Sequence, residues 1–501
     1  MDRSITTNWE PRVSSLALSS TDPITLETDV LVVGLFKGED GPFLAPGGEA
    51  VEAVWQDLTE SLAAVGATGA AGSISRLPSG GRLAAKLVLA VGLGKPDDDG
   101  RAGAEALRRA AGAAARAATG HRRVAFAIDA DPEALGLGAL LGSYRFGGYK
   151  TGPVSDRKKP VDTITLLNAT TDTDRITALA RAVGRVRDWV NTPANLLRPP
   201  AFAEQVGQEA REAGLGVEIL DEQALADGGY GGILAVGGGS QAGPRLVRLT
   251  YRAEGARQHV ALVGKGITFD TGGISIKPAA GMWDMKTDMG GAAAVAGTML
   301  AVAALKPRVN VTAYLAIAEN MPSGSAYRPG DVVTAYGGKT IEVLNTDAEG
   351  RMVMCDALVR AAEDNPDVIY DTATLTGGQV VALGKRTAGV MGTAAECDRV
   401  KAAGERVGEP NWPMPMPEEV RKMMESSIAD VSQCGAGLER SGHMLQAGIF
   451  LSHFVPEDMP WAHIDVAGPA HTTDTYGYIV KGATGVPVRT LVALIEERAE
   501  A

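Results

Sequence analysis

Apolar and amphipathic stretches alternate along the first 190 residues. Short runs rich in Val, Leu and Ala are bounded by polar turns, which predicts buried strands. Longer stretches with apolar residues at helical spacing predict helices. The predicted strands are residues 28–36, 82–93, 124–128 and 164–167, and the predicted helices are 51–65, 102–119 and 174–190. Strands that alternate with helices indicate an α/β fold with a largely parallel sheet.

The same alternation resumes after residues 191–195, where Asn, Thr and Pro interrupt the helical pattern. The uncharged run between Asp288 and Lys306 is mostly Gly and Ala and is too short for a bilayer span, so we expect a buried helix and no membrane segment. The strands expected in this half are 260–263, 309–317, 368–374 and 388–391. We therefore expect a domain over 1–170, a connecting helix over 171–190 and a second domain over 191–501.

The charge balance narrows the range of partners. The 501 residues include 60 acidic and 48 basic ones, a net charge of −12, which disfavours general binding to nucleic acid or to a membrane surface. The three cysteines are sparse and odd in number, which argues against a disulfide framework. Residues 1–10 show no charged-then-apolar signal pattern, so we expect a cytoplasmic protein.

Several common catalytic signatures are absent from the chain. It has no His-Glu-x-x-His sequence, its six histidines are scattered, and no phosphate-binding glycine loop follows the early strands. Residues 238–242 come nearest to a serine-hydrolase elbow, but they lack the final Gly and are better explained as a turn.

Two other segments concentrate glycine, lysine and carboxylate residues. In the first, the predicted strand 260–263 is expected to run into a glycine-rich loop that carries Lys265 and Asp270, and Asp288 stands at the start of the Ala-rich helix. Loops beyond the carboxyl ends of strands form the ligand crevice of an α/β sheet. We therefore expect these side chains to face a ligand.

The second segment is Asn345–Arg351. If it is extended, Asp347 and Glu349 point to the same side, because side chains alternate along a strand. With the two aspartates of the first segment they would make an oxygen-rich site for two divalent cations, since packing these charges together without cations would be costly. A lysine could add a nitrogen ligand if it were neutral. Two metals polarise a carbonyl and acidify a water, which indicates metal-assisted hydrolysis.

Each of these features also has a simpler interpretation. An isolated Asp-x-Glu sequence is usually part of a solvated face, and Gly-Lys-Gly is usually a turn. The two segments lie about 60 residues apart, so spacing alone leaves both interpretations open.

The motifs resemble those of the leucyl aminopeptidase family of two-metal exopeptidases, the cytosol aminopeptidases of bacterial type. Asn345–Arg351 matches the signature heptapeptide of that family residue for residue. The other matching blocks, in colinear order, are Asp188–Asn195, Val263–Pro278, Met285–Ala293, Thr372–Gly377, His463–Gly468 and Gly482–Arg489. The resemblance implies a smaller N-terminal α/β domain and a larger catalytic α/β domain with a central mixed sheet flanked by helices.

The resemblance also implies which residues bind metal. The more tightly held ion would be bound by Lys265, Asp270, Asp288 and Glu349. The more exchangeable ion would be bound by Asp270, by Asp347 through its side chain and main-chain carbonyl, and by Glu349. The ions implied are Mn²⁺ or Zn²⁺, with Mg²⁺ or Co²⁺ as alternatives at the exchangeable position.

Two cationic side chains complete the implied chemistry. Lys277 would polarise the scissile carbonyl and stabilise the oxyanion, and Arg351 would hold a bicarbonate that acts as general base. The free amino terminus of a peptide would sit on the tighter metal beside Asp288, which explains why the family removes terminal residues.

The substrate pocket and the assembly are further implications of the resemblance. The family prefers amino-terminal leucine and other apolar residues, and it assembles as a homohexamer, a dimer of trimers. Met285 has core packing as its alternative role, and the small Ala470 suggests a roomier pocket than that of some relatives. The implied pocket residues are Met285, Thr374, Gly377, Ala467 and Ala470.

Two other functions compete with this interpretation. Some family members bind DNA through the N-terminal region, and six arginines lie close together here, at positions 101, 108, 109, 116, 122 and 123. On an acidic chain we expect a helix flank of solvated arginines instead, and nucleic-acid binding is not expected. An inactive scaffold with the family fold is disfavoured because every implied ligand is retained. Residues 433–442 depart from the usual glycine-rich run and could alter access to the site or an assembly contact.

Overall fold

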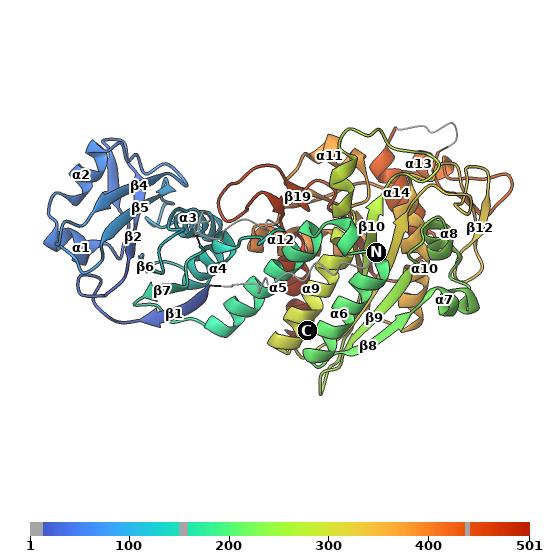
Figure 1. Ribbon diagram of the computed structural model, residues 1–501, viewed down its shortest axis with the longest axis horizontal. Helices are drawn as coiled ribbons and strands as arrows, with labels where there is room; N and C mark the ends of the chain where they lie inside the picture. The colour runs from blue at the N-terminus through green and yellow to red at the C-terminus, as the bar shows by residue number, and fades with distance from the viewer. Residues whose placement is uncertain (1–13, 150–158, 436–440, 501) are drawn as a thin grey trace. The chain divides into compact units, whose positions relative to one another are not determined.

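The computed structural model of the chain describes residues 14–149, 159–435 and 441–500 (Figure 1). Most of these residues up to Gly184, together with Thr473–Lys481, form a first compact unit, and Arg185–Thr472 with the residues from Gly482 form a second. The predicted lack of a signal over residues 1–10 concerns a segment outside the described residues, as does the central part of the divergent segment 433–442.

The first unit is built on a seven-stranded sheet with the order β1-β7-β6-β2-β5-β4, in which β3 also pairs with β2. β1, β7, β6, β2 and β5 run parallel, and β3 and β4 join antiparallel. Its strands are β1 (Ser15–Ser19), β2 (Val30–Lys37), β3 (Pro42–Leu44), β4 (Ile74–Pro78), β5 (Leu87–Gly94), β6 (Arg123–Ala127) and β7 (Thr163–Leu167). Its helices are α1 (Glu49–Val54), α2 (Leu58–Ala64), α3 (Ala104–Ala117), α4 (Pro132–Ser143) and the first part of α5 (Thr173–Asn191).

Two predictions for the first unit are wrong in detail. The strand predicted over 82–93 begins only at Leu87. The helix predicted over 51–65 is two short helices, α1 and α2, separated at Trp55–Asp57. Trp55 and Leu58 are both buried, and the turn between the helices lets both side chains reach the core.

The second unit is built on an eight-stranded mixed sheet with the order β16-β15-β18-β14-β10-β11-β9-β8. Its central strands β18, β14, β10 and β11 are parallel. Its strands are β8 (Gly216–Leu220), β9 (Arg245–Tyr251), β10 (His259–Asp270), β11 (Asn310–Asn320), β14 (Val368–Ala373), β15 (Ala388–Gly392), β16 (Asn411–Pro413) and β18 (Trp461–Asp465). Two small sheets are added: β12 (Val332–Thr334) with β13 (Thr340–Glu342) and β17 (Val431–Ser432), and β19 (His471–Thr472) with β20 (Gly482–Ala483).

Helices cover both faces of this large sheet (Figure 1). On one face lie α6 (Pro199–Glu212), α9 (Gly290–Leu305), α12 (Ala394–Val407) and α15 (Val488–Glu500). On the other lie α8 (Gly231–Gly237), α10 (Glu349–Glu363) and α14 (His443–Ser452), and the shorter α7 (Glu222–Gly228), α11 (Gly377–Leu383) and α13 (Glu418–Lys422) pack beside them. The two-domain α/β class with a mixed sheet flanked by helices is therefore confirmed.

The Ala-rich helix α9 is a core element, as predicted. Within the described ranges, Met282–Leu305 is the one helical segment long and apolar enough to cross a bilayer, and 78% of its most apolar window is buried inside the protein. A helix that is apolar on all sides is typical of a buried core position.

The strand before the first motif is longer than the sequence predicted. We expected a strand over 260–263 followed by a loop, but β10 continues to Asp270 and contains the Gly264-Lys265-Gly266 sequence. A Cβ atom on Gly264 would lie 2.7 Å from the Cα of Ala292, so glycine here lets the start of α9 approach the strand. Lys265 therefore projects from a rigid central strand rather than from a turn.

Candidate active site

Lys265 lies at the centre of a buried cluster of charged groups. Its side chain is 3% exposed, and its Nζ atom lies 2.8 Å from Asp288 Oδ1 and 2.9 Å from Glu349 Oε1. It also donates to the carbonyl oxygen of Thr374 at 3.0 Å. A Cβ atom on Gly350 would lie 2.6 Å from Lys265 Cε, so the glycine allows the first turn of α10 to close over the lysine.

Asp270 is the last residue of β10 and is held from three sides. Its Oδ1 atom accepts hydrogen bonds from the N–H of Gly272 and from Asn320 Nδ2, both at 2.8 Å. Its Oδ2 atom lies 2.6 Å from Lys277 Nζ. The same ammonium group also pairs with Asp347. Lys277 thus links the carboxylates of the two sequence motifs.

The second motif is not extended, so the alternation argument for its two carboxylates is wrong. Asp347 lies in a turn, and Glu349 is the first residue of α10. The carboxylates nevertheless converge: one oxygen each of Asp270, Asp347 and Glu349 lie within 4.8 Å of one another. The N-terminus of a helix favours an acidic side chain, which suits Glu349 to its position.

Asp288 faces the same cluster from the start of α9. Its Oδ1 atom accepts a hydrogen bond from Thr374 Oγ1 at 2.8 Å in addition to its contact with Lys265. Its Oδ2 atom is buried and makes no hydrogen bond. A buried carboxylate oxygen without a donor is costly and marks a place where a cation would be stabilised.

Burial and mutual repulsion set the electrostatics of the carboxylates. Burial raises the pKa of Asp270 to about 6, with repulsion from Glu349 acting in the same direction. Burial also raises the pKa of Asp288 and of Asp347 above their ordinary values. For Glu349, burial would raise the pKa, but the two lysines outweigh it and the pKa is lowered. The cluster has more carboxylate charge than its lysines balance, which favours added cations.

Burial and the neighbouring charges act on the two lysines in opposite directions. Burial alone would lower the pKa of Lys265 and of Lys277, but the surrounding carboxylates raise both above the ordinary lysine value. As ammonium groups they balance part of the negative charge. Lys265 could become a neutral nitrogen donor only when cations take over that role.

Arg351 lies two residues beyond Glu349 in α10 and is 2% exposed. Its Nη1 atom donates to the carbonyl oxygen of Gln433 at 2.7 Å, and its guanidinium carbon lies 5.9 Å from the ring centre of Phe450. Its Nε atom is buried and makes no hydrogen bond. Burial lowers the pKa of Arg351. A buried guanidinium with an unused donor is suited to a small anion.

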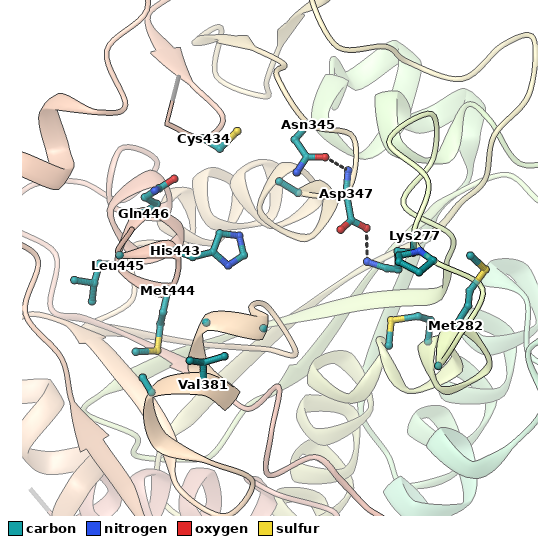
Figure 2. A pocket seen from close by; sticks show the side chains of 18 of the residues that line it. Lys277, Met282, Asn345, Asp347, Val381, Cys434, His443, Met444, Leu445 and Gln446 are labelled. Atoms are coloured by element: carbon teal, nitrogen blue, oxygen red, sulfur yellow. Dashed lines mark hydrogen bonds and ion pairs between the residues drawn. The ribbon is translucent and has the colours of Figure 1, made fainter. Parts of the chain in front are cut away.

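A cavity of about 1000 Å³ opens beside this cluster (Figure 2). Lys277 and Asp347 lie on one side of it, and His443, Met444 and Val381 lie on another. Its lining includes Met285, Gly377, Gly378, Leu445, Cys434 and Gln446. The site is thus a charged cluster next to a largely apolar pocket, an arrangement that can bind a peptide and polarise its end.

Of the five predicted pocket residues, two line the cavity and three do not. Met285 and Gly377 line the cavity. Thr374 instead contacts Asp288 and Lys265. Ala470 is buried, and its methyl group lies 3.5 Å from the position of a Cβ on Gly290, close to Thr374. Ala467 is half-buried and donates its N–H to Asp465. The last three do not line the cavity as described here.

Two buried amides that the sequence reasoning missed hold the carboxylates in place. Asn320, at the end of β11, donates to Asp270 Oδ1 and, at 3.0 Å, to the carbonyl oxygen of Thr346. Gln433 contacts the loop before α10. A polar residue at the carboxyl end of the predicted strand 309–317 was an available signal for Asn320. Gln433 had no comparable local signal.

Several arginines of the cluster in the first unit make ion pairs or hydrogen bonds with other residues of the same unit. Arg108 is 7% exposed, so the expected solvated flank is wrong for this residue. Arg108 and Arg109 pair with Glu105 at 2.9 and 2.7 Å, and Arg116 donates to the carbonyl oxygen of Gly477. Pairing with Glu105 and with a backbone carbonyl therefore satisfies part of the cluster inside the unit.

Comparison with known proteins identifies the family. The model described as the cytosol aminopeptidase family, catalytic domain, matches residues 185–492, and the model of the N-terminal domain of that family matches residues 32–153. A probable cytosol aminopeptidase of Streptomyces griseus is 50% identical over 97% of this chain and 99% of its own length.

Solved structures agree with this assignment. The bottromycin maturation enzyme BotP in complex with Mn superposes with a TM-score of 0.81 and 35% identity, covering 94% of this chain and 100% of that chain. A tomato leucine aminopeptidase variant has a TM-score of 0.84 and 30% identity, covering 97% of this chain and 96% of that chain. With the carboxylate–lysine cluster beside a peptide-sized pocket, these findings show that the chain belongs to the cytosol aminopeptidase family and is a metal-binding aminopeptidase, a hydrolase of peptides.

Proposed function

We propose that the second unit removes amino-terminal leucine and other apolar residues from peptides with the help of two divalent ions. Asp270 and Glu349 would bridge the ions, Lys265 and Asp288 would complete the tighter position, and Asp347 would complete the exchangeable one. The observation that carries the proposal is the convergence of Asp270, Asp347 and Glu349 within 4.8 Å of one another.

The donor set fits divalent cations. Carboxylate oxygens and one nitrogen suit Mn²⁺ and Zn²⁺, and they also suit Mg²⁺ or Co²⁺ at the exchangeable position. The buried, unpaired Oδ2 atom of Asp288 is the clearest sign of a missing positive partner. The raised pKa values of Asp270 and Asp288 point the same way, because burial and the neighbouring carboxylates both disfavour their charged forms and cations would stabilise those forms.

When bound, the ions would supply Lewis-acid polarisation of the scissile carbonyl and a water of lowered pKa. The role of the protein is to orient and to exclude water. Lys277 lies between the carboxylates and the cavity, where its ammonium group can donate to the oxygen on which negative charge develops. Asp288 carries a free oxygen that can accept from the amino terminus of the peptide.

Arg351 would hold a bicarbonate that accepts a proton from the attacking water. The unused, buried Nε donor of this guanidinium supports the assignment, because a bound oxyanion would satisfy it.

The first side chain of the peptide would be received by Met285 and Gly377, which line the cavity, and by Thr374, Ala467 and Ala470, which lie outside that lining. The small side chain of Ala470 leaves room for Leu, Met and Phe. A panel of Leu, Met, Phe and Gly substrates tests this, and exclusion of Phe would contradict it.

We also propose a cytoplasmic homohexamer, a dimer of trimers. We assign residues 1–170 to an N-terminal assembly or regulatory domain, 171–190 to a connecting helix and 191–501 to the catalytic domain. The curated relatives named cytosol aminopeptidases support the location.

The direct test is release of a chromophore from an N-terminal leucine anilide, with and without added Mn²⁺. We expect Mn²⁺ to stimulate the wild-type protein and Asp347→Ala to reduce kcat by about a hundredfold or more. Asp398→Ala, an exposed aspartate in α12, is the control and should behave like the wild type. A folded, metal-loaded protein that cleaves no amino-terminal residue would overturn the proposal.

A further inference from the structure

Gln433 is the first residue of the segment 433–442 that departs from the family pattern. It directly follows β17, which pairs in parallel with β13, so it runs alongside the residues that follow Glu342. Gln433 is fully buried at 0% exposure. A buried carboxamide needs specific partners, and the backbone groups that hydrogen-bond to the side chain of Gln433 all belong to one stretch of chain.

The partners of Gln433 are the residues that lead into the metal-site motif. Its Oε1 atom accepts from the N–H groups of Leu344 at 3.2 Å and Asn345 at 3.1 Å. Its Nε2 atom donates to the carbonyl oxygen of Ala348 at 3.1 Å. Its own N–H donates to the carbonyl of Glu342 at 2.9 Å. The side chain thus replaces the strand or helix partners that this irregular loop lacks.

Ala348 stands between Asp347 and Glu349 in the chain. It is also the residue just before α10, and it has no side-chain cap of its own. Holding the Ala348 carbonyl therefore fixes the backbone that carries both carboxylates. The carbonyl oxygen of Gln433 accepts from Arg351 Nη1 at 2.7 Å, so the same residue also orients the guanidinium.

Only an amide can make this set of contacts with one side chain. It offers an acceptor for two N–H groups and a donor for a carbonyl, whereas a carboxylate has no donor and a thioether has neither strong group. We propose that Gln433 is a positioning residue of the reaction: it sets the spacing of Asp347 and Glu349 for the divalent ions and the orientation of Arg351. This inference rests on the metal positions given under Proposed function.

The test compares Gln433→Met with Gln433→Glu and with a control. Methionine keeps the volume and loses all three side-chain hydrogen bonds, whereas glutamate keeps the acceptor and loses the donor to Ala348. Asn411→Leu is the control, because Asn411 is also a buried amide that donates to a backbone carbonyl, at 2.7 Å, and it lies in β16 away from the motif. All variants are made in the full chain.

The first readout is Mn²⁺ affinity of the folded protein, measured by competition with a fluorescent chelator. We expect Gln433→Met to bind the weaker Mn²⁺ about 10- to 100-fold less tightly, Gln433→Glu to be intermediate, and Asn411→Leu to match the wild type. The second readout is the split between kcat and KM on leucine anilide: kcat should fall and KM should stay close to wild type, because Gln433 itself is not among the residues that line the cavity. Saturating Mn²⁺ should restore part of kcat.

A purely structural role predicts another pattern. Both Gln433→Met and Asn411→Leu would then lower the melting temperature while leaving Mn²⁺ affinity unchanged, and that result would overturn the inference. If Gln433→Met does not fold, the Mn²⁺ affinity of Gln433→Glu decides alone, with wild-type affinity counting against us. A wild-type protein that binds Mn²⁺ but cleaves nothing would refute the proposed function and leave the Mn²⁺ comparison valid.

Discussion

Both α/β units have a cavity at the carboxyl ends of parallel strands, but among the described residues only the cavity of the second unit lies beside a cluster of buried charges. In the first unit the cavity is about 490 Å³ and lies where β2, β5 and β6 end, with Phe36, Leu93 and Ile128 among its lining. In the second unit the cavity is about 1000 Å³, and it lies beside the carboxyl end of β10 and the first turn of α10. Topology provides a crevice in both cases.

The two cavities differ in whether the charged side chains near them are exposed or buried. The polar residues around the first cavity, Arg101, Asp129 and Asp131, are exposed, and Asp131 accepts from the first N–H groups of α4. In the second unit, Lys265, Asp270 and Glu349 are buried and in contact. Folding alone gives no reason to bury so many charges at one place, and the excess charge supports the proposal that the chemistry occurs there.

The largest expected effect comes from removing one buried charge in the second unit. Glu349→Gln keeps the side-chain volume but removes a carboxylate from the cluster, so kcat on leucine anilide should fall by about a hundredfold or more. Asp129→Asn makes the same chemical change at the rim of the first cavity, where kcat should stay within about twofold. Equal losses in the two variants would show that the comparison is wrong.

The pH dependence of stability should also differ between the units. Burial raises the pKa of Asp356 in α10 to about 7, although three backbone N–H groups oppose the shift. A raised carboxyl pKa means that the stabilising contribution is complete below the ordinary value of 3.8 and is lost as pH rises through about 7. In the first unit, burial would raise the pKa of Asp29, but the N–H groups of Arg123 and Arg122 lower it, so its contribution is lost only below pH 3.8.

Hydrogen exchange of the Mn²⁺-saturated protein between pH 5 and 8 measures the effect of Asp356, and the first unit serves as the control because the contribution of Asp29 is constant in this range. The opening free energy of α10 amides should fall with rising pH in the wild type and should be flatter in Asp356→Asn, while β6 amides should show no such fall. A slope in α10 that persists in Asp356→Asn would assign the effect to another group.

The smallest expected effect on activity comes from a substitution that creates a steric clash in the first unit. A Cβ atom on Gly112 would lie 2.5 Å from the Cα of Tyr478, in the segment Thr473–Lys481 that belongs to that unit. Gly112→Ala should therefore destabilise the first unit by about 1–3 kcal/mol. Activity per folded molecule should remain within about twofold.

The control for this variant is Gly103→Ala, where an added Cβ meets no atom within 4 Å. Urea unfolding followed by proteolysis of the first unit, together with kcat/KM, separates stability from function. A large loss of kcat/KM in Gly112→Ala alone would mean that the first unit contributes directly to catalysis.

Hydrophobic pattern was sufficient to find the regular elements but not their limits. The strand predicted over 28–36 is β2, which is a continuous apolar run, and the helix predicted over 174–190 is α5, which has apolar residues at helical spacing. The Gly-Lys-Gly sequence was expected in a loop because lysine and glycine are poor strand formers. It lies inside β10 because Asp288 and Glu349 give Lys265 partners that no local pattern reveals.

The site was harder to derive than the fold. Glycine-rich motifs marked the chemistry-bearing residues, yet the argument that grouped Asp347 with Glu349 assumed an extended chain, whereas α10 begins at Glu349. The sequence marked residues 433–442 as unusual but could not reveal the role of Gln433, since its partners lie more than 80 positions earlier in the chain. Contacts of that separation follow from the tertiary fold and leave no periodic trace.

The central claim is that the buried carboxylate–lysine cluster of the second unit holds two divalent ions. Crystals grown with Mn²⁺ and measured at the manganese absorption edge test it most directly. The account predicts two anomalous peaks per chain, both in contact with Asp270 and Glu349, one of them also near Asp288 and the other near Asp347. A map with no peak at this cluster, or with peaks only at Asp129 and Asp131 of the first unit, would contradict it.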